Sequence, residues 1–202
     1  MGACNSGGKG ALSRGARSAN DAFDAYAKVT EDQREALAYY QEDGYSINAD
    51  LRDGYPLTDL QKEYIDVLDT AINSGEIKQD MTVYRGVGAN AFGITNQNEY
   101  YPMTSEQLVR EFQARIGKTY QDDGYFSTST EFSIAEDFAN NHGYNGAVVI
   151  EAKVRKGTKA MYLDRSGYGG SEKEMLFGRS KQQTIKGVRE ENGNVIVSVV
   201  LN

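Results

Sequence analysis

The strongest constraint on the fold is the change from helical to strand periodicity near residue 75. Before it, Thr30-Glu31-Asp32-Gln33 is a capping box that predicts a helix ending at Gly44, and Thr58-Asp59-Leu60-Gln61 predicts a second helix ending at Gly75. Residues 47–56 predict a short helical turn and a loop between them. After residue 75 most of the chain alternates apolar and polar residues in short segments, as half-buried strands do. Helices that come early and strands that come late are typical of an α+β fold.

Two shorter helices are predicted among the strands. Thr104 caps one that ends at Gly117 and buries Ile116 among other apolar residues, and Ser133 caps another that runs to about residue 139. Asn192-Gly193 predicts a tight hairpin turn near the C-terminus. The predicted strands are residues 81–85, 124–129, 147–154, 159–163, 174–177, 183–190 and 195–201.

Composition excludes several classes of protein. The net charge of −7 argues against a general basic surface for nucleic acid or anionic membrane, and no run approaches the roughly twenty apolar residues of a membrane span. A single cysteine, Cys4, and a single histidine, His142, allow no internal disulfide and too few soft ligands for zinc. The segment Gly86-Val87-Gly88-Ala89-Asn90-Ala91 lacks the third glycine of the dinucleotide fingerprint, so a Rossmann fold is not expected.

The N-terminal segment differs in composition from the rest of the chain. Residues 1–18 are rich in Gly, Ser and Ala and predict a flexible leader, which leaves 19–202 as a single domain. The start Met1-Gly2-Ala3-Cys4-Asn5-Ser6 fits the N-myristoylation pattern, with Cys4 placed for a second lipid. A processed precursor would give the same start, and we favour that interpretation over lipidation at Gly2.

Three polar stretches end or begin apolar segments. Thr82-Val83-Tyr84-Arg85-Gly86 is a strand pattern that ends in an arginine, and Gly124-Tyr125-Phe126-Ser127-Thr128-Ser129 is an aromatic strand that ends in hydroxyls. Glu172-Lys173-Glu174 leads into the apolar Met175-Leu176-Phe177. If residues 172–177 are extended, both glutamates point to one face, with Lys173 on the other. Each motif alone is common, whereas the ordered triple is much more specific.

This triple resembles the Arg-Ser-Glu class of mono-ADP-ribosyltransferase toxins and effectors, in particular the arginine-modifying members with Glu-x-Glu. The resemblance covers about residues 20–200. It implies an α+β fold in which a helical N-terminal part precedes a split two-sheet β core. It also implies that NAD is the substrate, that no metal is needed, and that an early helix borders the NAD cleft.

The resemblance assigns roles to individual residues. It implies that Arg85, Gly86, Ser127, Thr128 and Glu174 contact NAD, that Ser127 positions Glu174, and that Glu174 engages the ribose. The leaving nicotinamide is already cationic, so the site needs no general acid and must stabilise positive charge on the ribose. Arg85 has the planar donor head that suits a diphosphate. The alternative for Arg85 is a structural salt bridge with a neighbouring carboxylate.

Glu172 and a glycine-rich loop bear on the acceptor. An arginine guanidinium is a poor nucleophile unless a carboxylate orients it and accepts a proton. In the family, Glu at the position of Glu172 goes with arginine modification. The resemblance therefore implies a catalytic set of Arg85, Ser127, Glu172 and Glu174. Tyr168, in the loop of residues 164–171, matches the ring that recognises the target protein. A flexible hairpin loop without that role is the alternative.

The expected function is transfer of ADP-ribose from NAD to an arginine of a host or competitor protein. The family implies a bacterial toxin or effector that is secreted or injected and acts in the cytoplasm of a target cell. An NAD glycohydrolase and a non-catalytic binding module on the same fold are the alternatives. No nucleic-acid partner and no integral membrane segment are expected.

Overall fold

The computed structural model describes residues 29–96, 101–143, 146–163 and 172–202. Helices and strands follow one another along the described chain in a mixed order, which confirms the α+β class. In sequence they are α2 (Glu31–Asp53), α3 (Asp59–Ser74), β1 (Met81–Gly88), the 3-10 helix η2 (Ala89–Phe92), α4 (Ser105–Gln113), β2 (Thr119–Ser129), α5 (Phe132–His142), β3 (Ala147–Val154), β4 (Ala160–Tyr162), β5 (Glu174–Glu191) and β6 (Asn194–Leu201).

The strands form a six-stranded sheet in the order β2-β1-β3-β6-β5-β4, with an additional pairing of β2 with β5. Only β3 and β6 pair in parallel among the described strands. The first part of β5 pairs with β2 and β4, its last part pairs with β6, and the exchange occurs at Gln183 and Thr184. The expected two-sheet core is thus two halves that share β5 and are also joined by one β1–β2 pair, Tyr84 with Ser129.

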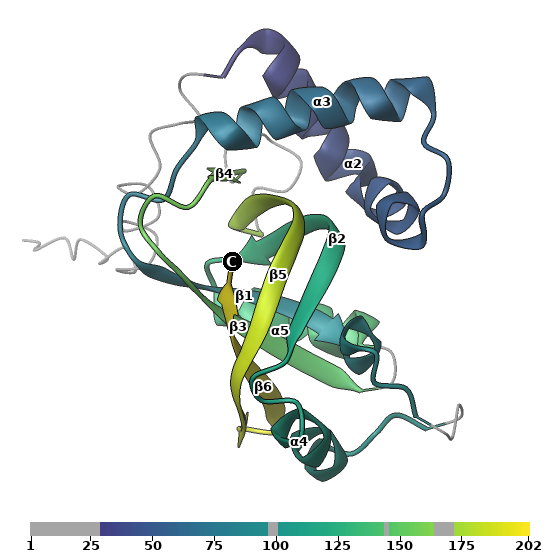
Figure 1. Cartoon of the computed structure of the whole chain (residues 1–202), viewed down its shortest axis with the longest axis vertical. Coiled ribbons are helices and arrows are strands. Elements are labelled where there is room, and N and C mark those ends of the chain that lie inside the picture. The colour runs from purple at the N-terminus through teal and green to yellow at the C-terminus, as the bar shows by residue number, and fades with distance from the viewer. Residues whose placement is uncertain (1–28, 97–100, 144–145, 164–171) are drawn as a thin grey trace, which may run out of the picture.

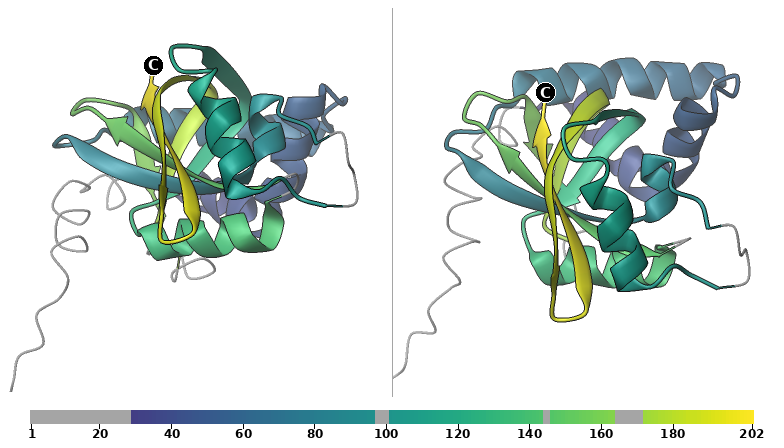
Figure 2. Two further views of the ribbon diagram at one scale, coloured as in Figure 1. Left: turned by 90° about the horizontal axis from the view of Figure 1, so that it is seen from below. Right: turned by 60° about the horizontal axis from the view of Figure 1, so that its bottom comes forward.

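The helices cover different parts of this β structure. Figure 1 shows α2 and α3 packed together at one end of the molecule and α4 at the other. Helix α5 lies along β1 and β3, on the side of the strands that is turned to the bottom in both views of Figure 2. Apolar side chains from α2, α3 and the strands form one continuous core, and a small second cluster lies beneath α5. The open space that this arrangement leaves lies between α2, β1, β2 and α5.

The prediction that the first helix ends at Gly44 is wrong. The capping box of α2 at Thr30 is present, but the helix continues through residues 47–52 and ends at Gly54, which has φ +70°. Asp43 departs from helical geometry, with φ −128° and ψ 17°, so the chain kinks there and does not end. A side chain at residue 44 would lie 3.0 Å from the Tyr40 ring, so glycine serves close packing at this point.

Two further helix predictions are wrong in detail. Helix α4 begins with the predicted capping box at Thr104 but ends at Gln113, and Ile116 beyond it is 51% exposed. Helix α5 begins one residue before Ser133 and has no side-chain cap, so the predicted box there does not form. Helix α3 has the predicted box at Thr58 and the predicted end at Gly75.

The strand predictions are closer. Residues 174–177 and 183–190, predicted as two strands, are parts of the single strand β5. The Asn192-Gly193 turn is confirmed, and both residues have the positive φ that a type I′ turn requires. No helix in the described part of the chain is long and apolar enough to cross a membrane. The predicted leader, Gly2 and Tyr168 lie outside the described residues.

Candidate active site

One cavity of about 750 Å³ lies between the helical part and the strands. Its size is that of a pocket for a nucleotide-sized ligand. The structure brings six of the seven predicted site residues to its wall: Arg85, Gly86, Ser127, Thr128, Glu172 and Glu174. The seventh, Tyr168, lies outside the described residues. The segments predicted to meet therefore do meet, whereas the roles of their side chains stay predictions.

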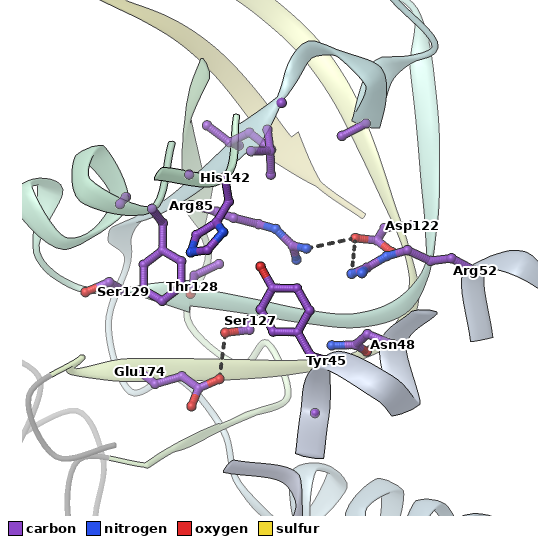
Figure 3. A pocket seen from close by; sticks show the side chains of 18 of the residues that line it. Tyr45, Asn48, Arg52, Arg85, Asp122, Ser127, Thr128, Ser129, His142 and Glu174 are labelled. Atoms are coloured by element: carbon purple, nitrogen blue, oxygen red, sulfur yellow. Dashed lines mark hydrogen bonds and ion pairs between the residues drawn. The ribbon is translucent and has the colours of Figure 1, made fainter. Parts of the chain in front are cut away.

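Ser127 and Glu174 are in direct contact (Figure 3). In the antiparallel pairing of β2 with β5, Ser129 lies opposite Glu174, so Ser127 is its diagonal neighbour on the same face. Ser127 Oγ donates a hydrogen bond of 2.6 Å to Glu174 Oε1. The register of two strands thus fixes the carboxylate against the hydroxyl.

Glu174 is deeply buried, with 6% of the residue exposed. Burial raises the pKa of its carboxyl to about 7, and the negative charge of Glu172 also raises it. The hydrogen bond from Ser127 and the positive charge of Arg85 act in the opposite direction on this pKa. The carboxyl therefore changes its charge near neutral pH.

Glu172 reaches the cavity by a different backbone path from the one predicted. The strand begins only at Glu174, and Lys173 has φ 47°, so residues 172–174 do not alternate as an extended strand. Ser129 Oγ donates a hydrogen bond of 2.7 Å to the Glu172 carbonyl oxygen and holds this bend. Burial raises the pKa of the Glu172 carboxyl, which strengthens it as a base.

Arg85 lies within β1 and not at its end, since the strand continues to Gly88. Its guanidinium lies 4.9 Å from the centre of the Phe126 ring, and its Nη2 lies 3.4 Å from Asp122 Oδ2. Nη1 is buried without a hydrogen-bond partner among the described residues. The alternative of a structural salt bridge is therefore realised in part, and one donor group of Arg85 remains uncommitted.

Gly86, which the resemblance implies as an NAD contact, is a glycine that close packing requires. A Cβ there would lie 2.1 Å from the Ala135 carbonyl oxygen and 2.4 Å from the Ala139 nitrogen, both in α5. Thr128 is also a predicted NAD contact. Its hydroxyl donates a hydrogen bond of 2.8 Å to the Met175 carbonyl oxygen. The Thr128 hydroxyl thus stabilises the β2–β5 pairing at the cavity.

Sequence reasoning missed two charged residues of the cavity wall, Arg52 and Asp122. Arg52 Nε lies 2.7 Å from Asp122 Oδ1 and its Nη2 lies 3.1 Å from Oδ2. Asp122 therefore contacts Arg52 of α2 and Arg85 of β1 together (Figure 3). The only signal in the sequence was the acidic pair before Gly124-Tyr125, which does not show that α2 lies opposite.

Aromatic side chains stand at the mouth of the cavity. Tyr45 of α2 is 74% exposed, and its ring centre lies 6.1 Å from that of His142 (Figure 3). His142 is the last residue of α5, which runs three residues beyond the predicted end at about residue 139, and it is exposed. Phe138 of the same helix lies on its other side, at 5.9 Å between ring centres.

These groups can hold an anionic ligand such as a diphosphate. Two guanidinium groups can bind a diphosphate, and the uncommitted Nη1 of Arg85 needs an acceptor. Across the described residues, no three His, Cys, Asp or Glu side chains are grouped as a metal site requires. The cavity is walled on one side by α2, as expected for the early helix.

Comparison with known proteins identifies the family. The model of the ADP-ribosyltransferase exoenzyme family matches residues 18–201. The chain belongs to this family. A curated relative, NAD(+)–arginine ADP-ribosyltransferase EFV of Enterococcus faecalis, is 27% identical over 164 residues. The match covers 81% of this chain and 26% of the relative. This chain therefore spans about a quarter of the relative's length.

Solved structures show the same fold. Plx2a, an ADP-ribosyltransferase toxin from Paenibacillus larvae, has a TM-score of 0.76 at 23% identity, with 93% of this chain and 92% of that chain covered. C3stau2 from S. aureus, solved with NAD, has a TM-score of 0.77 at 20% identity and 95% coverage of both chains. The reaction of this ADP-ribosyltransferase family is the transfer of ADP-ribose from NAD.

Proposed function

We propose that the protein transfers ADP-ribose from NAD to an arginine side chain of a target protein. The observation that carries this proposal is the hydrogen bond of 2.6 Å between Ser127 and Glu174 in a cavity that Arg85 and Glu172 also line. An E. faecalis relative named for arginine modification supports the choice of acceptor.

Each group of the set has a distinct task. Arg85 binds the diphosphate through donors that Asp122 leaves uncommitted. Ser127 holds the Glu174 carboxylate in place, and this carboxylate binds the ribose hydroxyl and offsets the positive charge that develops at the anomeric carbon. Fixed charges in a buried site act strongly there because little water screens them.

Glu172 acts on the acceptor. The bond from the ribose carbon to nicotinamide breaks and nicotinamide leaves with the electron pair. A guanidinium nitrogen of the acceptor then bonds to the same carbon, and its proton passes to Glu172. Burial raises the pKa of Glu172, so its carboxylate takes this proton more readily than an exposed glutamate.

The test is incubation of the purified protein with labelled NAD and a cell lysate, followed by mass spectrometry. We expect ADP-ribose on arginine side chains. Glu172→Gln should reduce arginine labelling by about 10²-fold or more, because the general base is lost, while release of nicotinamide from NAD continues. The control is Glu190→Gln, which removes an exposed glutamate of the β5–β6 hairpin and should leave labelling unchanged.

The outcomes separate the rivals. Free ADP-ribose without labelled protein would make the protein an NAD glycohydrolase. Intact NAD would make it a binding module on the same fold. Label on a residue other than arginine would refute the acceptor.

We further propose that the protein is a bacterial toxin or effector that acts in the cytoplasm of another cell. The solved relatives named as toxins support this role. Production of the protein inside a eukaryotic or competitor cell should inhibit growth, and Glu174→Gln should abolish that inhibition.

A further inference from the structure

The two arginines of the cavity wall come from different parts of the fold and share one carboxylate. Arg52 belongs to α2 and Arg85 to β1, whereas Asp122 lies on β2 between them (Figure 3). Asp122 accepts from Nε and Nη2 of Arg52 and pairs with Nη2 of Arg85. These contacts leave Nη1 of Arg85, a residue of the cavity wall, buried and without a hydrogen-bond partner among the described residues.

The backbone around Asp122 is built to hold its carboxylate. The register of β2 against β5 shifts between Asp122 and Tyr125, and the Gly124 nitrogen donates a hydrogen bond of 3.0 Å to Asp122 Oδ1. The Tyr125 nitrogen donates to Asn48 Oδ1 at 2.7 Å, which docks this bulge on α2. A Cβ at Gly124 would lie 2.8 Å from Asn48 Oδ1, so glycine permits the approach.

The charges explain why a carboxylate is needed here. Two guanidinium groups repel each other, and the proximity of Arg52 acts with burial to lower the pKa of Arg85. Asp122 acts in the opposite direction and favours the charged form of Arg85. The Arg52 side chain is 37% exposed, so without Asp122 its head is free to move into solvent.

We propose that Asp122 is a positioning residue for NAD, which holds Arg52 and Arg85 together so that their remaining N–H groups meet the diphosphate. This inference rests on the proposed function for NAD as the substrate. Asp122 itself does not touch the reacting atoms. Its contribution is the geometry of the two donors before NAD binds.

A second carboxylate allows a sharp test of this role. Asp123 is the next residue, lines the same cavity and is exposed. It accepts a hydrogen bond from Gln121 Nε2 and pairs with neither Arg52 nor Arg85. If Asp122 acted only as a negative charge near the diphosphate, removal of either charge would tighten NAD binding. If Asp122 positions the arginines, Asp122→Asn weakens NAD binding and Asp123→Asn does not.

The experiment is calorimetric titration of NAD and of ADP-ribose into the wild-type protein and both variants, well below their melting temperatures. Asp122→Asn should raise the Kd for both ligands about tenfold, which is the effect of losing one charge-assisted hydrogen bond between an arginine and the diphosphate. Asp123→Asn should leave the Kd unchanged or lower it. In steady-state NAD cleavage, Asp122→Asn should raise KM with kcat nearly unchanged. The arginines bind the diphosphate equally in the ground state and in the transition state, so weaker binding there affects both states alike. Asp122→Glu, which retains the charge, should restore part of the affinity.

An equal or tighter Kd in Asp122→Asn would overturn the inference, and so would a loss in kcat at unchanged KM. A wild-type protein that binds NAD without cleaving it would refute the proposed function and still test the role of Asp122 through the Kd. A wild-type protein that binds neither NAD nor ADP-ribose would refute both.

Discussion

Glu174 is held by opposing influences on one carboxyl group. Burial favours its neutral form, whereas the Ser127 hydroxyl and the Arg85 charge favour its ionised form. The proposed role needs the ionised form, since only a carboxylate offsets positive charge on the ribose. The balance places the pKa of the Glu174 carboxyl at about 7 in the protein without ligand.

A pH profile follows from this pKa. Below about 7 Glu174 is protonated and inactive in the proposed role, and above it the group is ionised, so kcat/KM for NAD cleavage should rise with pH through about 7. Because Ser127 lowers this pKa, Ser127→Ala should move the midpoint to higher pH. Initial rates of nicotinamide release between pH 5 and 9 measure both. A midpoint near 4.5, the ordinary value, would contradict the assignment.

At the scale of single residues, sequence reasoning found the groups with a recognisable order in the chain. It placed Arg85, Ser127 and the glutamate pair in one site, and the cavity contains all of them. It missed Arg52 and Asp122, because their pairing joins residues 70 positions apart. Ordinary surface arginines and aspartates look the same in a sequence.

Helix α5 and strand β1 approach each other closely beside the site. The backbone of α5 occupies the space that a side chain at Gly86 would need. This contact fixes the strand that carries Arg85 against the helix that carries Phe138 and His142. The wall of the cavity is therefore tightly packed on this side.

Gly86→Ala should displace the helix or the strand. We expect a loss of about 2–3 kcal/mol in the free energy of unfolding, seen as a melting temperature about 5–10 °C lower. The matched control is Gly187→Ala in β5, where a Cβ would meet nothing within 4 Å and stability should change by less than about 0.5 kcal/mol. Thermal unfolding followed by circular dichroism measures both. Equal melting temperatures for the two variants would refute the packing role.

Three of the four predicted helix starts are confirmed, and the exception is the box predicted at Ser133. The capping boxes at Thr30, Thr58 and Thr104 all form, because a box is a local interaction within four residues. The stop at Gly44 was wrong because the helix kinks at Asp43 and continues, and its second half docks on β2 through the hydrogen bond from the Tyr125 nitrogen to Asn48 Oδ1. Helix boundaries that depend on distant contacts have no local signal.

For the whole molecule, β5 is the strand that unites the site with the core. Its first residue, Glu174, lines the cavity, and its later residues exchange β2 for β6 as partner. The sequence predicted two strands here, since Gly178 to Gln182 lack apolar alternation. The α+β class was predictable from the order of elements, whereas this shared strand depends on pairings across the whole domain.

The measurement that tests the central claim most directly is nicotinamide release from NAD by the wild-type protein and Glu174→Gln under saturating NAD. Circular dichroism spectra and melting temperatures serve to establish that both proteins are folded. We predict that release falls by about 10²-fold or more in Glu174→Gln, because the carboxylate beside Ser127 no longer offsets the charge on the ribose. Release at the wild-type rate by a folded Glu174→Gln protein would contradict the account.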